Sequence, residues 1–465
     1  MQSPAQVFSA NLLAALSELE VEEVFLSPGS RSQSLAIAAQ QLHDANRLVL
    51  RVRIDERSMA FTALGAAKAS GRPVAIITTS GTAVANLLPA VLEASHSGVP
   101  LILLTADRPA ELRGVGANQT TNQVGIFGDS VRSCIDVEAP TDPVDPNQPK
   151  ALAEQAVATA LGINQDSPGP VQLNLCFREP LSSAEPNASD LYPGAMLSEQ
   201  NNFQPSFAVL AGEKNTILVA GAEAGLEALE AAEAFGWPIF AEPSSRCRIG
   251  ANAIVGYPAL LEEDKALSDG IERVVVYGKP TLSRQVQRLI ARRDIELVVV
   301  KSKLMGPFNP YANATEIVDE ITVNGEVSND WLARWRVAAH NWLSVQETGK
   351  SLDRRKIIEV VYEASEIEDT IVLGASRMIR EADTWAPAKA VRVFSNRGLA
   401  GIDGTIATAT GIALGGEGSF TRAIIGDLTL LHDASSMIED GEEDLNLQLI
   451  MVNDHGGSLF EKLEV

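Results

Sequence analysis

The sequence predicts an α/β protein made of three doubly wound domains with mainly parallel sheets. Two observations lead to this fold class. Short apolar stretches of strand length alternate with segments of helical pattern along most of the 465 residues, which is typical of parallel sheets covered by helices. A chain of this length also exceeds the usual size of one domain, so two to four domains are expected.

Residues 1–185 form the predicted first domain. The helix expected over residues 55–71 has clear ends, because Asp55 can cap its N-terminus and Gly71 can end it. A second helix is expected over residues 82–98. Strands are expected at residues 22–27, 48–54, 74–81, 100–109 and 169–175.

A linker and two further α/β domains follow. Residues 186–206 are rich in Ser, Pro and Asn without a clear period, which predicts a linker. The central domain is expected over residues 207–345 and the third over 346–465. The third domain stops soon after its last strand and turn, so we expect it to be truncated or to lack its final strands. Strands are expected at 216–222, 238–242, 273–278, 295–300, 370–376, 390–396, 422–427 and 447–454.

Two helices are also expected in the later part of the chain, over residues 329–345 and 353–365. Trp331, Trp335 and Trp342 fall on or near one face of the first of these helices, which indicates packing rather than ligand binding.

Composition excludes several classes of function. The formal net charge of −23 argues against nucleic acid as the main partner, although a few inward-pointing arginines suffice for small anionic substrates. The sequence has no apolar run of ~18 residues and no basic segment before an apolar stretch at its start, so neither a membrane span nor a secretory signal is expected. The cysteines at 134, 176 and 247 are widely spaced, which favours neither a disulfide framework nor a zinc knuckle. Together these features predict a cytoplasmic protein.

Two acidic turns near the end of the chain indicate a metal site. One predicted strand ends in Gly426-Asp427-Leu428, and another ends in Asn453-Asp454-His455-Gly456-Gly457. Both turns follow strands, at the sheet edge where open α/β folds bind ligands. Two carboxylates and a backbone carbonyl can hold Mg²⁺ and leave room for a diphosphate and water. Two ordinary acidic turns are the alternative interpretation.

Arginines in turns after predicted strands indicate a site for anions. Arginine binds carboxylates through two parallel hydrogen bonds and keeps its charge when partly desolvated. Each one alone could form a surface salt bridge, but several together suggest a substrate with more than one carboxylate. Ser376 and Arg380 share a helical face if that turn is helical. The other polar residues in such turns are Ser30, Arg31, Arg108, Asn118, Gln119 and Arg397.

Several motifs resemble one enzyme family closely. They are PGSRS, IDERS, TSGTAVANLLPA, LTADRP, GANQ, SNRG followed by GIDG, and GDL with NDHGGSLF, in that order from residue ~24 to ~460. The family is the 2-succinyl-5-enolpyruvyl-6-hydroxy-3-cyclohexene-1-carboxylate synthases of menaquinone biosynthesis, which use thiamine diphosphate. The central domain is similar only near Gly278–Thr281 and Arg284. Leu428 and Asp454 depart from the usual GDG and Asn of thiamine-diphosphate enzymes, although GDL is common in this family.

This resemblance implies a transferase that uses thiamine diphosphate with Mg²⁺ (or Mn²⁺). It decarboxylates 2-oxoglutarate, and the resulting enamine adds in a 1,4 sense to isochorismate, giving the family product and CO₂. The cofactor supplies the electron sink while the protein binds and orients. The family places the pyrimidine in the first domain of one subunit and the diphosphate in the third domain of another. We therefore expect a homodimer or a dimer of dimers.

The resemblance also implies a role for each matched residue. The Glu56 carboxyl group binds N1′ of the aminopyrimidine and promotes removal of the C2 proton, while Asn118 and Gln119 contact intermediates. Ile402 props the cofactor in its bent shape, although core packing explains an isoleucine equally well. The implied metal ligands are Asp427, Asp454 and the Gly456 carbonyl. The implied cofactor contacts also include Ser80, Gly81, Thr82, Gly426, Leu428, Leu459 and Phe460. The implied substrate-binding residues are Ser30, Arg31, Arg108, Arg284, Ser376, Arg380 and Arg397.

Three alternatives remain open. The chain could be another thiamine-diphosphate enzyme, such as an acetolactate synthase or a 2-oxo acid decarboxylase, and turnover of pyruvate without isochorismate would favour that. A non-catalytic homologue is a second alternative, favoured by a lack of Mg²⁺-dependent cofactor binding. A dinucleotide-dependent dehydrogenase is a weaker alternative, because no G-x-G-x-x-G follows a strand with an acidic residue at the required distance.

Overall fold

The structure is a computed structural model. It describes residues 3–163, 167–183, 194–197, 204–302, 304, 306–327, 329–346, 352–416, 420–438 and 445–456. The chain divides into two compact units. The first unit comprises residues 1–201, 403–416 and 432–445, and the second comprises residues 202–402, 417–431 and 446–465. The stretch after residue 402 therefore contributes to both units.

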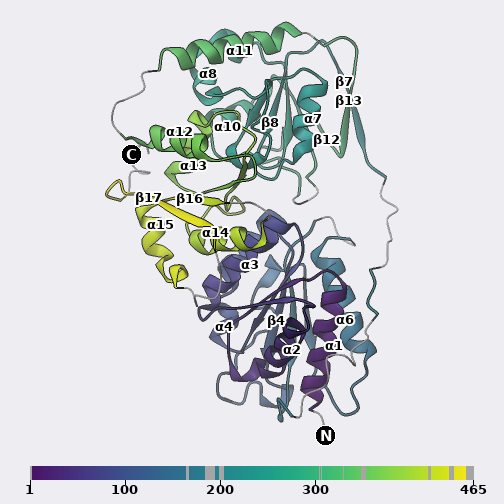
Figure 1. The fold of residues 1–465 in the computed structure, drawn as a ribbon. Coiled ribbons are helices and arrows are strands. Elements are labelled where there is room, and N and C mark those ends of the chain that lie inside the picture. Colours follow the sequence, from purple (N-terminus) through teal and green to yellow (C-terminus); the bar gives the residue numbers. More distant parts are fainter. Residues whose placement is uncertain are drawn as a thin grey trace. The chain divides into compact units, whose positions relative to one another are not determined.

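A six-stranded sheet forms the centre of the first unit, and all its strand pairs are parallel (Figure 1). Its order is β2-β1-β3-β4-β6-β5, so the direction of winding reverses between β1 and β3. Ligand sites in such sheets lie at this reversal, beyond the carboxyl ends of the strands. The strands are β1 (Glu23–Leu26), β2 (Val49–Val52), β3 (Val74–Thr78), β4 (Leu101–Asp107), β5 (Ser133–Val137) and β6 (Val171–Cys176).

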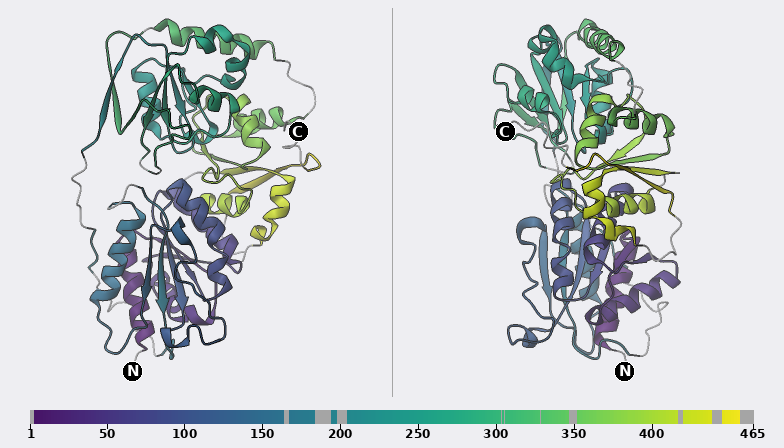
Figure 2. Two further views of the ribbon diagram at one scale, coloured as in Figure 1. Left: turned by 180° about the vertical axis from the view of Figure 1, so that it is seen from behind. Right: turned by 90° about the vertical axis from the view of Figure 1, so that its left-hand side faces the viewer.

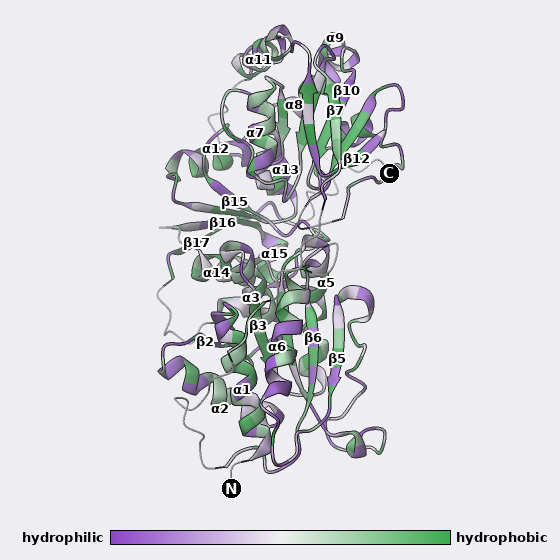
Figure 3. Ribbon diagram, turned by 90° about the vertical axis from the view of Figure 1, so that its right-hand side faces the viewer, coloured by the Kyte–Doolittle hydropathy of each residue, from purple (hydrophilic) through white to green (hydrophobic). Residues whose placement is uncertain are grey.

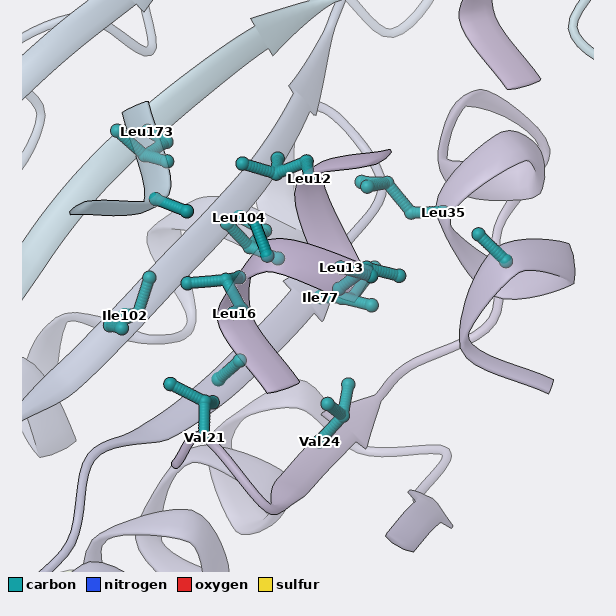
Figure 4. Packing of buried hydrophobic residues seen from close by; sticks show 14 of the residues in the cluster. Leu12, Leu13, Leu16, Val21, Val24, Leu35, Ile77, Ile102, Leu104 and Leu173 are labelled. Atoms are coloured by element: carbon teal, nitrogen blue, oxygen red, sulfur yellow. The ribbon is translucent and has the colours of Figure 1, made fainter. Parts of the chain in front are cut away.

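Helices cover both faces of this sheet because its central strands are apolar on both sides. One core joins α1 (Pro4–Glu18), α2 (Gln33–Asp44) and α6 (Asn147–Ala160) to the sheet. Leu12, Leu13 and Leu16 of α1 are buried in it together with Ile77 and Leu104 of the sheet (Figure 4). Each such buried side chain contributes roughly 1.5–3 kcal/mol. The opposite core contains α3 (Glu56–Ser70) and α5 (Leu88–Ser97).

Helix α3 also packs closely against α14 (Thr405–Gly415), and glycines allow this approach. A Cβ at Gly411 would lie 1.9 Å from the Thr62 carbonyl oxygen, and a Cβ at Gly65 would lie 2.1 Å from the Thr408 carbonyl oxygen. No larger residue fits at either position without moving a backbone.

The helix predicted over residues 82–98 is wrong as a single element. The structure has a short helix α4 (Thr82–Ala85) and then α5, with a break at Asn86 and Leu87. Pro89 explains the break, because proline inside a continuous helix lacks the N–H donor and its ring clashes with the preceding turn. At the second position of a new helix, the same proline is tolerated.

The second unit contains three parallel sheets, with orders β12-β11-β10-β8-β9, β13-β7 and β15-β14-β16-β17. Figure 2 shows residues 202–402 of this unit in teal to green. The winding reverses between β8 and β10 in the first sheet and between β14 and β16 in the last. The strands are β7 (Phe207–Ala211), β8 (Thr216–Ala220), β9 (Ile239–Ala241), β10 (Arg273–Tyr277), β11 (Glu296–Val300), β12 (Glu316–Val318), β13 (Glu320–Asn324), β14 (Thr370–Leu373), β15 (Arg392–Phe394), β16 (Thr421–Gly426) and β17 (Leu447–Val452).

Helices of the second unit bury the predicted tryptophan cluster. Trp331 and Trp335 are buried, and Trp342 stacks on Trp385 with ring centroids 4.9 Å apart, so the packing role predicted for these residues is confirmed. Apolar strands lie beneath helices with polar outer faces (Figure 3). None of the described helices is long and apolar enough to cross a bilayer. The helices are α7 (Leu226–Ala234), α8 (Tyr257–Glu263), α9 (Lys265–Asp269), α10 (Arg284–Ile290), α11 (Asn329–Ser344), α12 (Arg354–Ala364), α13 (Arg377–Trp385) and α15 (Asp427–His432).

Candidate active site

The first unit gathers predicted site residues where the winding of its sheet reverses. Arg108 follows β4, and its Nη1 donates to the Gln119 carbonyl oxygen over 2.8 Å and to the Ser80 hydroxyl. The Gln119 side chain donates back to the Ser80 carbonyl oxygen over 2.9 Å. Gly81 has φ 88°, and a Cβ there would lie 3.1 Å from the Gln119 side chain, so glycine is needed at this turn. Ser80, Gly81, Arg108 and Gln119 therefore lie together, as the parallel strand ends predict.

Arg31 and Arg108 make this edge of the sheet positive. Burial lowers the pKa of Arg108, and the charge of Arg31 lowers it further, while Asp107 opposes the change. Arg31 Nη1 donates to the Phe177 carbonyl oxygen over 3.0 Å. Its Nε is buried and has no hydrogen-bond partner among the described residues. Arg31 and Arg108 repel each other, and the buried Nε of Arg31 makes no hydrogen bond among the described residues. An anionic ligand would relieve this repulsion and accept from that donor.

Glu56 is the first residue of α3 and is half-buried. The Asp55 carboxylate caps the helix by accepting from the backbone N–H of Arg57 and Ser58, so the predicted cap is confirmed. The Arg57 side chain donates to Asp433 over 3.1 Å, and Ser435 donates to Asp55 over 3.1 Å. The start of α3 is thus held on two sides, which fixes the backbone that carries Glu56.

Three further predicted residues of the first unit lie in the same loops with exposed side chains. They are Ser30, in a short 3₁₀ turn after β1, Thr82, at the start of α4, and Asn118, next to Gln119. Their exposure leaves them accessible to a ligand, but the structure gives them no bond to the arginines.

The predicted metal turns lie side by side in the second unit. Strands β16 and β17 are paired, with Gly426 opposite Val452, so Asp427 and the turn at residues 453–456 follow neighbouring strand ends. Gly456 has φ 77°, and a Cβ there would lie 4.0 Å from Asp427 Oδ2. Nothing lies within 4 Å of the place that a Cβ of Gly426 would take. Oxygen donors beside open backbone fit a hard cation and a diphosphate.

Asp454 forms an ion pair with Arg354. Arg354 Nη2 donates to Asp454 Oδ2 over 2.8 Å, so this carboxylate is shared between an ion pair and its predicted metal role. His455 is exposed, and its backbone N–H donates to the Asn453 side chain over 3.0 Å, which shapes the turn. The described residues contain no group of three or more His, Cys, Asp or Glu that could hold a metal ion. A site here therefore depends on the backbone carbonyl and the diphosphate as well as on Asp427 and Asp454.

Two predicted substrate arginines, Arg284 and Arg397, lie within electrostatic reach of a third, Arg380, in the second unit. Desolvation lowers the pKa of Arg380, and the charges of Arg397, Arg377 and Arg284 lower it further. The Arg380 side chain is exposed and donates over 3.0 Å to the carbonyl oxygen of Ser376, the residue before α13. The helix begins at Arg377, so the shared helical face expected for Ser376 and Arg380 stays a prediction. Arg397 is buried, and Arg284 is exposed at the start of α10. The group forms a second concentration of positive charge.

Some predicted residues stay outside this description. Leu459 and Phe460, together with Gly457, lie beyond the described residues. Leu428 is exposed on α15. Ile402 is half-buried and is the last residue of the second unit before the chain enters the first. Its predicted contact with a cofactor stays a prediction.

Sequence reasoning missed residues that hold these sites in place. Gln123 accepts from the Gly81 N–H over 2.9 Å and donates to Asn174 over 3.0 Å, which ties the Gln119 loop to the sheet. Glu242 is buried at the end of β9 and accepts from the backbone of Thr281. An acidic residue directly after an apolar strand was a usable signal for Glu242. Gln123 had no such signal, because its partners lie far away in sequence.

The chain is similar to one family model and to several named proteins. The family model of the thiamine pyrophosphate enzyme N-terminal TPP binding domain matches residues 7–126. A 2-succinyl-5-enolpyruvyl-6-hydroxy-3-cyclohexene-1-carboxylate synthase of Leifsonia xyli subsp. xyli (strain CTCB07) is 41% identical over 514 aligned positions, covering 100% of this chain and 87% of that protein. The synthase of Kineococcus radiotolerans is 43% identical, covering 99% of this chain and 85% of that protein. The synthase of Arthrobacter sp. (strain FB24) is 42% identical, covering 96% and 76%.

The fold and the matched domain define a thiamine pyrophosphate enzyme. Identity of 41–43% along nearly the whole chain then assigns the particular family. The chain belongs to the 2-succinyl-5-enolpyruvyl-6-hydroxy-3-cyclohexene-1-carboxylate synthases.

Proposed function

We propose that this chain is a thiamine-diphosphate-dependent transferase that decarboxylates 2-oxoglutarate and joins the remaining carbons to isochorismate, in menaquinone biosynthesis. The observation that carries the proposal is the gathering of Arg284, Arg380 and Arg397 in the unit that also holds the Asp427 turn. A decarboxylase of 2-oxo acids with a small uncharged side group binds a substrate with one carboxylate, so one cation is enough. Three arginines suit substrates that bring several carboxylates.

Thiamine diphosphate supplies the electron sink for loss of CO₂ when it is bound. In our proposal, Glu56 holds a proton at N1′ of the aminopyrimidine. A carboxyl group suits that task because it can share a proton with a ring nitrogen. Asp55 and Arg57 fix the backbone of Glu56. Its half-buried side chain is the group that we propose contacts the ligand. Ile402 supports the cofactor through apolar contact.

Asp427, Asp454 and the Gly456 carbonyl are the proposed Mg²⁺ ligands, and Mn²⁺ is an acceptable substitute because both ions prefer oxygen donors. The metal would hold the diphosphate against the open backbone at Gly426. Arg354 must release or share Asp454 for this arrangement. We also propose that the cofactor contacts the apolar side chains of Leu428, Leu459 and Phe460.

Each of the two units contributes arginines that orient substrates. In the first unit, Arg31 and Arg108 lie at the strand ends with Ser80 and Gln119, beside the loops of Ser30, Thr82 and Asn118. In the second unit, Ser376 and the three arginines supply another anion site.

We further propose that the enzyme is a cytoplasmic homodimer or a dimer of dimers. The family arrangement needs Glu56 from one subunit and Asp427 from another at a single cofactor. The net charge of −23 fits a protein that binds small anions at local arginine sites rather than nucleic acid.

The decisive test is release of CO₂ from 2-oxoglutarate in the presence of thiamine diphosphate and Mg²⁺, with and without isochorismate, and with mass spectrometry of the product. We expect the coupled product only when both substrates are present. Turnover of pyruvate without isochorismate would instead favour an acetolactate synthase or a 2-oxo acid decarboxylase. Replacement of Arg397 by Ala should raise the KM for 2-oxoglutarate or isochorismate about tenfold or more. Arg288→Ala, at an exposed ion pair with Glu262, is the matched control.

A further inference from the structure

Glu242 is a buried acid that no step of the proposed reaction uses. It follows β9, and its side chain is 2% exposed. Its Oε1 accepts from the backbone N–H of Thr281 over 2.6 Å and of Leu282 over 2.8 Å. Its Oε2 is buried without a hydrogen-bond partner among the described residues. A buried acid with two backbone donors holds a turn, because those donors would otherwise lose their hydration without compensation.

The turn that Glu242 holds is connected to two of the predicted substrate arginines. The Thr281 hydroxyl accepts from Arg397 Nη2 over 2.6 Å. Two residues further on, Ser283 caps α10, and Arg284 is the first residue of that helix. The turn is therefore bonded to Arg397 through a side chain and to Arg284 through the backbone.

The other side of the same turn is also anchored. Backbone hydrogen bonds join Lys279 to Ala222 in both directions, at 2.9 and 3.2 Å. Lys279 Nζ donates to the Gly398 carbonyl oxygen over 2.7 Å, next to Arg397. Because both ends of the turn are fixed, loss of the Glu242 contact would affect its middle, where Thr281 lies.

Several charged and titratable groups lie near Glu242. Asp383 faces it from α13, and Arg397 faces it from the turn after β15. Tyr257 of α8 donates to Asp383, and Arg248 donates to the carbonyl oxygens of Ala241 and Ala386. The positive charges of Arg248, Arg397 and Arg380 act on Asp383 as well and lower its pKa. The two buried acids thus lie among the arginines that the proposed function assigns to substrate.

We propose that Glu242 is a positioning residue. It holds the turn at Thr281 and Leu282 so that the Thr281 hydroxyl fixes the guanidinium of Arg397 in the orientation that binds a substrate carboxylate. This inference rests on the proposed function for the identity of the substrate. All the contacts of this network lie within the second unit.

The protonation state of Glu242 fits this role. Burial, and next the nearby Asp383 carboxylate, raise the pKa of Glu242 to about 8. Burial also raises the pKa of Asp383 to about 6. The raised pKa favours the neutral form of Glu242, which limits the negative charge beside Arg397. A glutamine at position 242 keeps both the acceptor oxygen and the neutral charge.

The test compares three variants with the wild-type enzyme, using the KM for 2-oxoglutarate, kcat and hydrogen exchange of the backbone at residues 278–284. Glu242→Ala should raise KM about tenfold and speed exchange at Thr281 and Leu282. Thr281→Val removes only the hydroxyl, so it should raise KM by a similar factor while exchange stays slow. Glu242→Gln should restore slow exchange and the wild-type KM at pH 7. Glu230→Ala, on the exposed side of α7, is the control.

The outcomes separate the inference from the function on which it rests. A wild-type chain that releases no CO₂ from 2-oxoglutarate contradicts the proposed function, while the exchange data still test the contact network. An active wild type with an unchanged KM in Thr281→Val overturns the role of Glu242. The same holds if Glu242→Ala lowers only the amount of folded enzyme and leaves the KM of the remaining enzyme unchanged.

Discussion

Arg57, the residue after Glu56, donates from Nη2 to Asp433 Oδ1 over 3.1 Å, and Asp433 Oδ2 accepts from the backbone N–H groups of Ile406 and Ala407 at 2.7 and 3.1 Å. One carboxylate thus joins the first turn of α3 to the first turn of α14. Asp433 is fully buried, and burial raises its pKa although these donors oppose the change. The position of the proposed catalytic acid therefore depends on a contact outside its own helix.

Replacement of Arg57 by Ala should destabilise the first unit by about 2 kcal/mol, because it leaves a buried carboxylate without its charged partner. Thermal unfolding followed by circular dichroism measures the change. Arg72→Ala is the control, because its pair with Glu22 is about half exposed and should contribute little. An equal, small effect of both variants would contradict the bridging role of Asp433.

Replacement of Gly411 by Ala should destabilise the first unit by about 1–3 kcal/mol or more, because the new Cβ would lie 1.9 Å from the Thr62 carbonyl oxygen. Denaturant unfolding measures the loss. Gly306→Ala is the matched control, since nothing lies within 4 Å of the Cβ position at that residue. If Gly411→Ala were as stable as the control, the close packing of α3 and α14 would be refuted.

Replacement of Asp427 by Ala should abolish the Mg²⁺ dependence of thiamine diphosphate binding and weaken affinity by about 100-fold, because it removes a charged metal ligand. Isothermal titration calorimetry with and without Mg²⁺ measures this. Asp294→Ala, at an exposed ion pair, is the control and should bind normally. Unchanged affinity in Asp427→Ala would remove this residue from the metal site.

Replacement of Glu242 by Gln should change how stability depends on pH. The folded-state pKa of Glu242 is raised from 4.5 to about 8, so its contribution to stability is fully present below pH 4.5 and is lost as pH rises to about 8. Burial also raises the pKa of Asp383, and the two acids titrate as a pair, so the comparison with the glutamine variant covers pH 6 to 8. The glutamine variant should gain roughly 2 kcal/mol over the wild type in this interval. Parallel unfolding midpoints from pH 6 to 8 would contradict a raised pKa.

Local patterns in the sequence predicted much of the fold. Asp55 and Gly71 bound α3 as expected, and the strand ends at Gly426 and Val452 place the two acidic turns side by side. Pro89 was the exception, since the apolar pattern continues through it while its missing N–H breaks the helix. Edge strands such as β5 were not predicted, because polar residues on their exposed faces interrupt the apolar pattern.

The supporting contacts of the site could not be predicted in the same way. Asp433 meets Arg57 across 376 residues, and Glu242 meets Thr281 across 39. Nothing in the local pattern of either acid indicates its partner, because only packing of distant elements brings them together. Arginines in turns after strands were visible in sequence, and so was the acidic residue after β9, whereas the contacts that connect them were not.

The most direct test of the account is the rate of deuterium exchange at C2 of bound thiamine diphosphate, measured by NMR after acid quench. The wild-type enzyme should exchange this proton far faster than free cofactor. Glu56→Gln should bind the cofactor with nearly unchanged affinity yet lose the acceleration, because an amide cannot share the proton at N1′. Wild-type exchange in Glu56→Gln would contradict the assignment of Glu56 as the activating acid, and with it the central claim.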